Sequence, residues 1–339
     1  MDVVRLLVRR AFLALPVLFG VLLLTFMLIR LGNNDPVGIL AGPTPTDADI
    51  ERIIAKLKLD LPVWRQFWEF IVLVAQGDLG YSWLSDRPVT GELLLRLPAT
   101  IELVMFGAVL GAAVGIPSGL IAAFRPNQWF DQVSRVVSLL GFGMPTLFLG
   151  LAAIFVFFFL LEWAPPPMGR LDLVLTPPAT ITGSYFLDGI LHGDWEAARS
   201  AGARLVLPIC SVALVFAAPL VKQTRAIALD VLGSDYVRFA RAAGLPPAMV
   251  RRLVWRNSSV PIVTYIGIEL TALFGAAAVL ELIFSWGGLS QFGLTAMLRG
   301  DFAVVQGYVL FMSLIAMAIF AITDIVVLTI EPRARTGQR

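Results

Sequence analysis

Acidic side chains inside long apolar runs are the residues of this sequence best placed to do chemistry. Glu269 lies about nine residues into an apolar run at 260–284, or about 13 Å along a helix. A carboxylate at that depth can contact a cationic part of a solute, such as a peptide amino group, or can be a protonated packing residue. Glu281, near the other end of the run, can line a solute entrance or tie down an outer loop. Glu102 and Asp324 lie near helix ends, where we expect structural roles.

Signatures of enzymatic chemistry are missing from the sequence. No G-x-x-x-x-G-K-[ST] loop is present to cradle nucleotide phosphates, and the lysines are Lys56, Lys58 and Lys222. His192 stands alone in a loop segment, and Cys210 is the single cysteine. We therefore predict no catalytic residue, no metal ligand and no cofactor in this chain, so that any ATP and Mg²⁺ must be bound by another protein.

The composition indicates a membrane protein. The apolar share is 58% and the charged share is 15%, against about 45–50% and 25% in globular domains. Such a chain cannot cover itself with polar surface, so lipid must be one of its solvents. The net charge of +2 gives no sign of a nucleic-acid partner.

Apolar segments long enough to cross a bilayer occur along the whole chain. The first follows Arg5, Arg9 and Arg10 and could be read as a signal peptide, but its apolar stretch is longer than usual for one and no cleavage site follows closely. We predict an all-α, polytopic membrane protein with one domain, residues 1–339. The six expected transmembrane helices are at about 11–29, 100–124, 136–161, 205–221, 260–284 and 304–330.

Basic residues set the expected orientation. With the N-terminus in the cytoplasm, the cytoplasmic segments hold 15 of the 26 Lys and Arg residues in much less length than the outer ones. Both termini and a loop at 222–259 are then cytoplasmic. The outer loops, about 30–96 and 164–204, should form an extracytoplasmic cap, which includes an amphipathic helix from about Asp47.

The cytoplasmic stretch from Asp230 to Pro261 has the clearest local signals. Ser234 can cap a short helix from Asp235, and Gly244 can end that helix in a left-handed conformation. Pro246 and Pro247 can then open the next helix.

The short helix should carry one apolar face. Tyr236, Phe239, Ala240 and Ala243 fall at i, i+3, i+4 and i+7, with arginines on other faces. Because so short a helix is marginal in water, the face must pack against something. The residues alone leave two readings open, a docking partner or anionic lipid.

The sequence D-Y-V-R-F-A-R-A-A-G at Asp235–Gly244 resembles the cytoplasmic loop of binding-protein-dependent ABC permeases, in the version of the dipeptide, oligopeptide and nickel family. R-N-S-S-V-P at Arg256–Pro261 resembles that family's continuation into the fifth helix. Further landmarks are similar over nearly the whole chain: Asn34–Gly42, Gly77–Ser82, Leu97–Leu103, Glu281–Leu289, Asp301–Gly307 and Glu331–Arg333.

A few positions depart from the family pattern. Ala243 stands where Lys is common, Gly287 where Pro is common, Phe320 where Asn is frequent, and Glu331 where Asp or Asn is usual. These departures bear on the substrate class more than on the family.

The resemblance implies a function, a set of partners and a coupling site. It implies a permease subunit, in a bacterial inner membrane, of an ATP-driven importer for dipeptides or related small peptides. Its implied partners are a second homologous permease, two ATPase subunits and an extracytoplasmic solute-binding protein. In that family the loop helix sits in a groove of the ATPase subunit. Carried onto this chain, the coupling residues are Asp235, Tyr236, Arg238, Phe239, Ala240, Ala242 and Gly244.

Two alternatives remain at this stage. The same family includes importers of nickel, glutathione and oligopeptides, and the sequence does not choose among these solutes. A different class, a proton-coupled secondary transporter using Glu269 and Asp324, often has repeated halves, and no such repeat is visible here.

Overall fold

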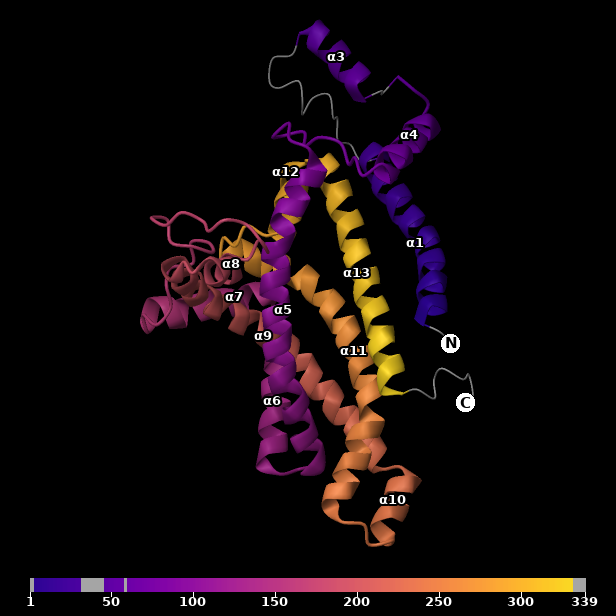
Figure 1. Ribbon diagram of the computed structural model, residues 1–339, viewed down its shortest axis with the longest axis vertical. Coiled ribbons are helices and arrows are strands. Elements are labelled where there is room, and N and C mark those ends of the chain that lie inside the picture. The colour runs from indigo at the N-terminus through magenta and orange to yellow at the C-terminus, as the bar shows by residue number, and fades with distance from the viewer. Residues whose placement is uncertain (1–2, 32–45, 58–59, 332–339) are drawn as a thin grey trace.

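The structure, a computed structural model, describes residues 3–31, 46–57 and 60–331, which form helices joined by turns and loops (Figure 1). The motif at Asn34–Gly42 and the tail beyond Glu331 lie outside the described residues. In chain order the helices are α1 (Val3–Leu31), α3 (Asp47–Leu57), α4 (Val63–Ala75), α5 (Val89–Phe124), α6 (Trp129–Gly143), α7 (Thr146–Ala153), the π-helix η1 (Ile154–Leu160), α8 (Tyr185–His192), α9 (Trp195–Leu232), α10 (Asp235–Ala242), α11 (Pro247–Ile283), α12 (Leu289–Arg299) and α13 (Phe302–Ile330).

Five of these helices are long and apolar enough to cross a membrane, and a bent pair brings the number to six. The five are α1, α5, α9, α11 and α13, and the bent pair is α6 with α7 and η1. The all-α, polytopic fold expected from the sequence is confirmed. Several helices extend past their apolar runs. The clearest case is α9, whose polar ends are also helical. At its start, the Asp194 side chain caps the helix by accepting a hydrogen bond from the Ala197 N–H.

The expectation of one continuous third helix over 136–161 is wrong. The chain bends by 106° between α6 and the α7–η1 segment. Met144 is extended, with ψ of 132°, because the Pro145 ring disfavours a helical residue before it. Pro145 then becomes the N-cap of α7.

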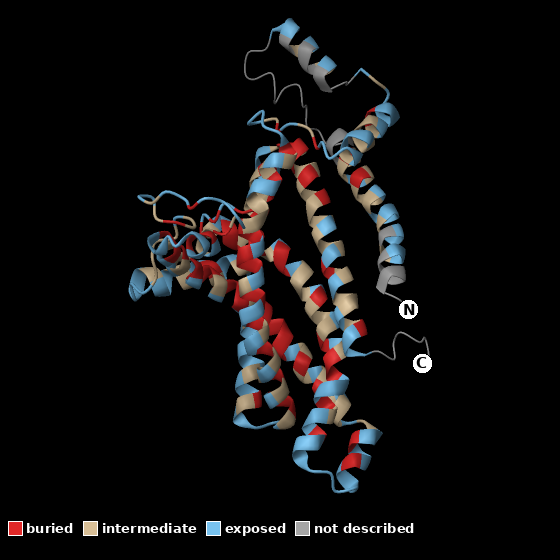
Figure 2. Ribbon diagram, viewed as in Figure 1, coloured by how far each residue is buried: buried red, intermediate tan, exposed pale blue. Residues whose placement is uncertain are grey.

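The core of the molecule is the contact between α5 and α9. Four glycines of α5, at intervals of four residues, face α9, and they bring the two backbones close together. A Cβ at Gly107 would lie 2.3 Å from the Val212 side chain, and one at Gly111 would lie 2.8 Å from the Ala213 carbonyl oxygen. Buried residues accordingly concentrate along α5, α9 and α11 (Figure 2).

Two further contacts fix the outer helices. Asp324 of α13 forms an ion pair with Arg10 of α1, which is the anchoring role expected for this carboxylate. Phe26 of α1 packs against the rings of Phe67 and Phe70 in α4. The amphipathic helix expected from Asp47 is present as α3, beyond the end of the bundle that carries α12 (Figure 1).

Candidate functional site

The helix α10 stands at one end of the molecule, between the ends of α9 and α11 (Figure 1). We refer to this as the α10 end, and to the opposite end of the bundle as the α12 end. Gly244 follows α10 with φ of +74°, and its N–H donates to the Arg241 carbonyl. The Leu245 N–H donates to the Ala240 carbonyl, which completes a Schellman motif. Pro247 then opens α11, so the predicted stop and restart are both confirmed.

The predicted capping role of Ser234 is wrong. Ser234 does occupy the N-cap position of α10, but its side chain accepts no hydrogen bond there. Its hydroxyl instead donates to the Val231 carbonyl at 2.6 Å. The carbonyls at the end of α9 lack partners within their own helix, and the hydroxyl satisfies one of them.

The face that α10 packs against its own chain is not the apolar face for which a docking partner or lipid was expected, and the two faces share only Ala240. Val237 is fully buried in a cluster with Ala228, Val250 and Val254, and Ala240 is nearly fully buried as well. Periodicity alone could not show that Val237, rather than its larger neighbours, would point inward.

The large aromatic residues of α10 are therefore exposed. Phe239 retains 75% of its accessible surface and Tyr236 retains 46%. Asp235 and Arg238 pair loosely at 3.6 Å on the same exposed side, and Ala242 and Gly244 are exposed as well. Of the seven predicted coupling residues, only Ala240 faces the chain's own core.

Glu269 and Glu281 lie apart from α10 and from each other. Glu269 is partly exposed and accepts a hydrogen bond from the Tyr265 hydroxyl at 2.5 Å. Glu281 is fully buried, where it accepts hydrogen bonds from the Thr100 hydroxyl at 2.5 Å and from the Gln291 N–H at 2.7 Å. The contacts of Glu281 favour the role of tying segments together over that of lining an entrance.

Sequence reasoning missed a buried ion pair near α10. Asp131, in the first turn of α6, pairs with Arg225 of α9, and the Asp131 side chain is fully buried. The two residues are 94 positions apart. The sequence alone could show only that Asp131 lies in the first turn of a helix. No local spacing links Asp131 to Arg225.

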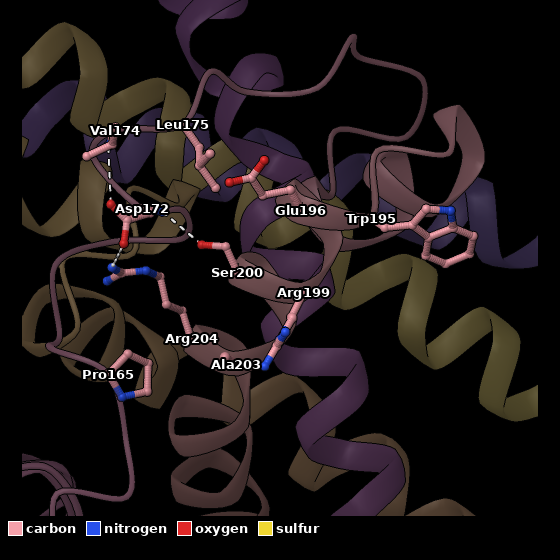
Figure 3. Close-up of a pocket in the computed structure, with 10 residues that line it drawn as sticks. All are labelled: Pro165, Asp172, Val174, Leu175, Trp195, Glu196, Arg199, Ser200, Ala203 and Arg204. Carbon is pink, nitrogen blue, oxygen red and sulfur yellow. Dashed lines mark hydrogen bonds and ion pairs between the residues drawn. The ribbon is translucent and has the colours of Figure 1, made fainter.

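An open pocket of about 800 Å³ lies where the 161–194 segment meets the start of α9 (Figure 3). Arg204 donates to the Asp172 carboxylate at 2.9 Å, and the Asp172 N–H donates to the Ser200 hydroxyl. Hydrogen bonding by the Val174 N–H and by Arg204 holds the pKa of Asp172 below its usual range. Among the described residues, no group of His, Cys, Asp and Glu side chains could hold a metal ion.

Comparison with known proteins extends over nearly the whole chain. Residues 115–336 match the family described as "Binding-protein-dependent transport system inner membrane component". Residues 3–104 match its companion, "Binding-prot-dependent transport system membrane comp, N-term". The two matches together cover residues 3–336 except for 105–114, which lie in the middle of α5.

Individual relatives are similar at full length. The chain is 35% identical to the probable D,D-dipeptide transport system permease protein DdpB of Escherichia coli (strain K12), over 95% of this chain and 94% of DdpB. It is 35% identical to the di/tripeptide transport system permease protein DppB of Pseudomonas aeruginosa (strain UCBPP-PA14), over 96% and 97%. Identity is 30% to the glutathione transport system permease protein GsiC of Escherichia coli O6:H1, over 97% and 98%.

Proposed function

Because the chain belongs to the family of binding-protein-dependent transport system inner membrane components, we propose that it is a permease subunit of an ATP-driven importer for dipeptides or related small peptides. Relatives named for dipeptide or di/tripeptide transport match it at 31–35% identity and the glutathione permease at 30%, which supports the peptide substrate. The observation that carries the mechanism is the exposed aromatic surface of α10.

In this proposal α10 is the helix that docks onto an ATPase subunit. Val237 and Ala240 fix the helix to the permease, while Tyr236 and Phe239 present large apolar surface outward. Aromatic side chains are enriched at the centres of protein interfaces, where truncating one costs more than losing most other contacts. The exposed Asp235 and Arg238 supply a polar rim.

The position of α10 favours a protein partner over lipid. The apolar run of the fourth span ends at Val221, whereas α9 continues to Leu232, about 16 Å farther along the helix. The intervening turns carry Lys222, Arg225 and Asp230. A helix held at that distance from the apolar run lies outside the hydrocarbon core, so its aromatic side chains need a different apolar partner.

The proposed orientation places the α10 end and both termini in the cytoplasm, following the distribution of basic residues. A tag at Arg339 should then be cytoplasmic, and a tag in the loop at Asp86 should be outside. Accessibility of each tag to an impermeant protease in intact cells and in inverted vesicles measures this. Finding both tags on one side would contradict the six-span arrangement.

The mechanism we propose is alternating access. An extracytoplasmic binding protein delivers peptide to a pair of homologous permeases, and closure of the ATPase dimer on ATP moves α10 and, with it, α9 and α11. This chain forms one half of the pathway, with Glu269 as its candidate contact for a peptide amino group. ATP and Mg²⁺ are bound by the ATPase subunits, because this chain has no phosphate-binding loop.

The test is reconstitution of the whole complex in proteoliposomes with ATP inside and the binding protein outside. We expect uptake of labelled dipeptide that depends on ATP, competes with unlabelled dipeptide and is insensitive to collapse of the proton gradient. The purified chain alone should hydrolyse no ATP. Uptake by this chain alone that is driven by a proton gradient would overturn the proposal, and preferential uptake of glutathione would correct its substrate.

A further inference from the structure

The ion pair between Asp131 and Arg225 links α6 to the part of α9 that leads to α10. Arg225 Nε donates to Asp131 Oδ1 at 2.5 Å and Arg225 Nη2 donates to Oδ2 at 3.0 Å, so the pairing is bidentate. The Asn127 N–H also donates to Oδ2, at 2.8 Å. The carboxylate is therefore fully occupied inside the protein, with no exposure to solvent.

This ion pair joins two parts of the chain that differ in their attachment to α10. Arg225 lies on α9 ten residues before α10, and the last turns of α9 share the cluster that buries Val237. Asp131 begins α6, which leads through the 106° bend into α7. Movement of α10 reaches α9 directly through packing, whereas α6 packs mainly against α9 and α5.

The attachment of α6 does not rest on an apolar core. Its buried residues are Asp131 and Ser138, whereas Val133, Val136, Leu139 and other large apolar side chains of α6 are exposed. A further close approach to α9 is at Gly141, near the far end of α6, opposite Ala218. At the start of α6, the link to α9 is thus a directional ion pair rather than a contact between large apolar side chains.

The location of this carboxylate is unusual among the described residues. The other buried carboxylates are on the α12 side of the molecule or in the 161–194 region, namely Glu102, Asp188, Glu281 and Asp301. Burying a carboxylate is costly unless it is paired, and a pair of well-packed apolar residues could hold two helices together as well. The ion pair adds a fixed geometry, since a bidentate pairing allows little rotation of one helix against the other.

We propose that Asp131 and Arg225 are positioning residues that make the α6–α7 span move with α9 when the ATPase displaces α10. The proposal rests on the function proposed above and deepens it by naming the route of the motion. Without the ion pair, α10 would still dock and ATP would still be hydrolysed, but the α6–α7 span would no longer move with α9.

The experiment compares Asp131→Asn, Arg225→Gln and the reversal Asp131→Arg with Arg225→Asp, all in the reconstituted complex. The matched control is Arg135→Gln, because Arg135 approaches Asp131 at 3.5 Å from the same helix and so adds charge without linking α6 to α9. The measurements are permease inserted, ATPase subunits retained per permease, ATP hydrolysed, and dipeptide taken up per ATP hydrolysed.

We expect both single variants to retain ATPase subunits and hydrolysis while dipeptide uptake per ATP falls at least tenfold. The reversal should restore a good part of that ratio, and Arg135→Gln should stay within about twofold of the wild-type protein. An unchanged ratio in the single variants would show that the pair only packs the helices.

Two further outcomes are also decisive. If the single variants fail to insert, the charge-reversal double variant decides. If it inserts but dipeptide uptake per ATP stays low, the proposal is contradicted. If it inserts and uptake per ATP is also restored, the proposal is supported. Failure of the wild-type chain to retain any ATPase subunit would instead contradict the function proposed above, so the two failures are distinguishable.

Discussion

The two ends of the molecule are held together by different chemistry. At the α12 end, buried carboxylates accept hydrogen bonds from segments distant in sequence, with Glu281 bound to Thr100 and Asp301 to Ser82 and the Trp83 N–H. At the α10 end, the helices are held by one buried ion pair and by a cluster of buried Ala and Val side chains, with partly buried Leu and Phe side chains packed against it.

This difference teaches how one chain can combine a fixed end with a moving one. Each buried hydrogen bond at the α12 end is directional, and breaking it leaves a polar group without a partner. The apolar contacts between α10 and its neighbours are not directional and tolerate sliding at lower cost, and the ion pair joins α6 to α9 rather than to α10. The aromatic side chains of α10 remain available to a partner. We therefore expect substitutions at the two ends to separate stability from coupling.

The largest expected effect comes from the α5–α9 contact that both ends depend on. Gly111→Leu should destabilise the fold by about 3 kcal/mol, because even its Cβ would meet the Ala213 carbonyl oxygen at 2.8 Å, and a backbone atom cannot rotate away. Gly275→Leu is the matched control, since no atom lies within 4 Å of a Cβ built there. Thermal unfolding of the purified proteins in detergent measures both, and equal losses would contradict the account of the α5–α9 contact.

At the α12 end, Thr100→Val should destabilise the fold by about 2 kcal/mol. The substitution keeps the shape but removes a hydroxyl that donates to Glu281 and accepts the Leu289 N–H at 2.7 Å. Thr264→Val serves as the control, because the exposed Thr264 hydroxyl bonds only within its own helix. If the two variants unfold at the same temperature, the buried network does not fix this end.

At the α10 end, Gly244→Ala should loosen α10 by about 1 kcal/mol while the bundle keeps its stability. The cost arises because Gly244 has φ of +74°, a conformation that a residue with a Cβ resists. Gly233→Ala, on the other side of α10, is the control, since its φ of −80° suits alanine. Hydrogen exchange of the α10 amides measures the effect. Identical exchange rates in both variants would show that the left-handed conformation of Gly244 is not needed to end α10.

The smallest expected effect is a dependence on pH in the 161–194 region. The pKa of Asp172 is lowered by the Val174 N–H and by Arg204, so the stabilisation is present above the ordinary Asp value of 3.8 and is lost as pH falls through the lower folded value. Amide protection near Asp172 should decrease below about pH 4. Asp172→Asn should remove this dependence on pH. If amide protection in the variant still falls with pH as in the wild-type protein, the hydrogen bonds of Asp172 do not stabilise this region.

Much of the fold was readable from local sequence. Long apolar runs predict the membrane-crossing helices, and Gly244 with Pro247 predicts where α10 stops and α11 starts. The bend at Met144 was not predicted, although Pro145 marks the place, because membrane helices often tolerate an internal proline. Whether a proline kinks a helix or breaks it depends on neighbours that the local sequence does not specify.

The rest required three-dimensional packing. Asp131 and Arg225 are 94 residues apart, and Thr100 and Glu281 are 181 residues apart. Helical periodicity predicted an apolar face on α10 but not its direction, because the burial of Val237 is decided by α9 and α11. Local sequence thus indicated the candidate helix and did not indicate the contacts that hold it.

The central claim, that α10 presents Phe239 to an ATPase subunit, is tested most directly by counting ATPase subunits retained per permease after purification of Phe239→Ala. Because Phe239 is 75% exposed, the variant should insert and unfold like the wild-type protein while retention falls at least tenfold. Trp129→Ala, which truncates a 73% exposed aromatic residue at the start of α6, should retain ATPase subunits normally. Wild-type retention by Phe239→Ala would contradict the account.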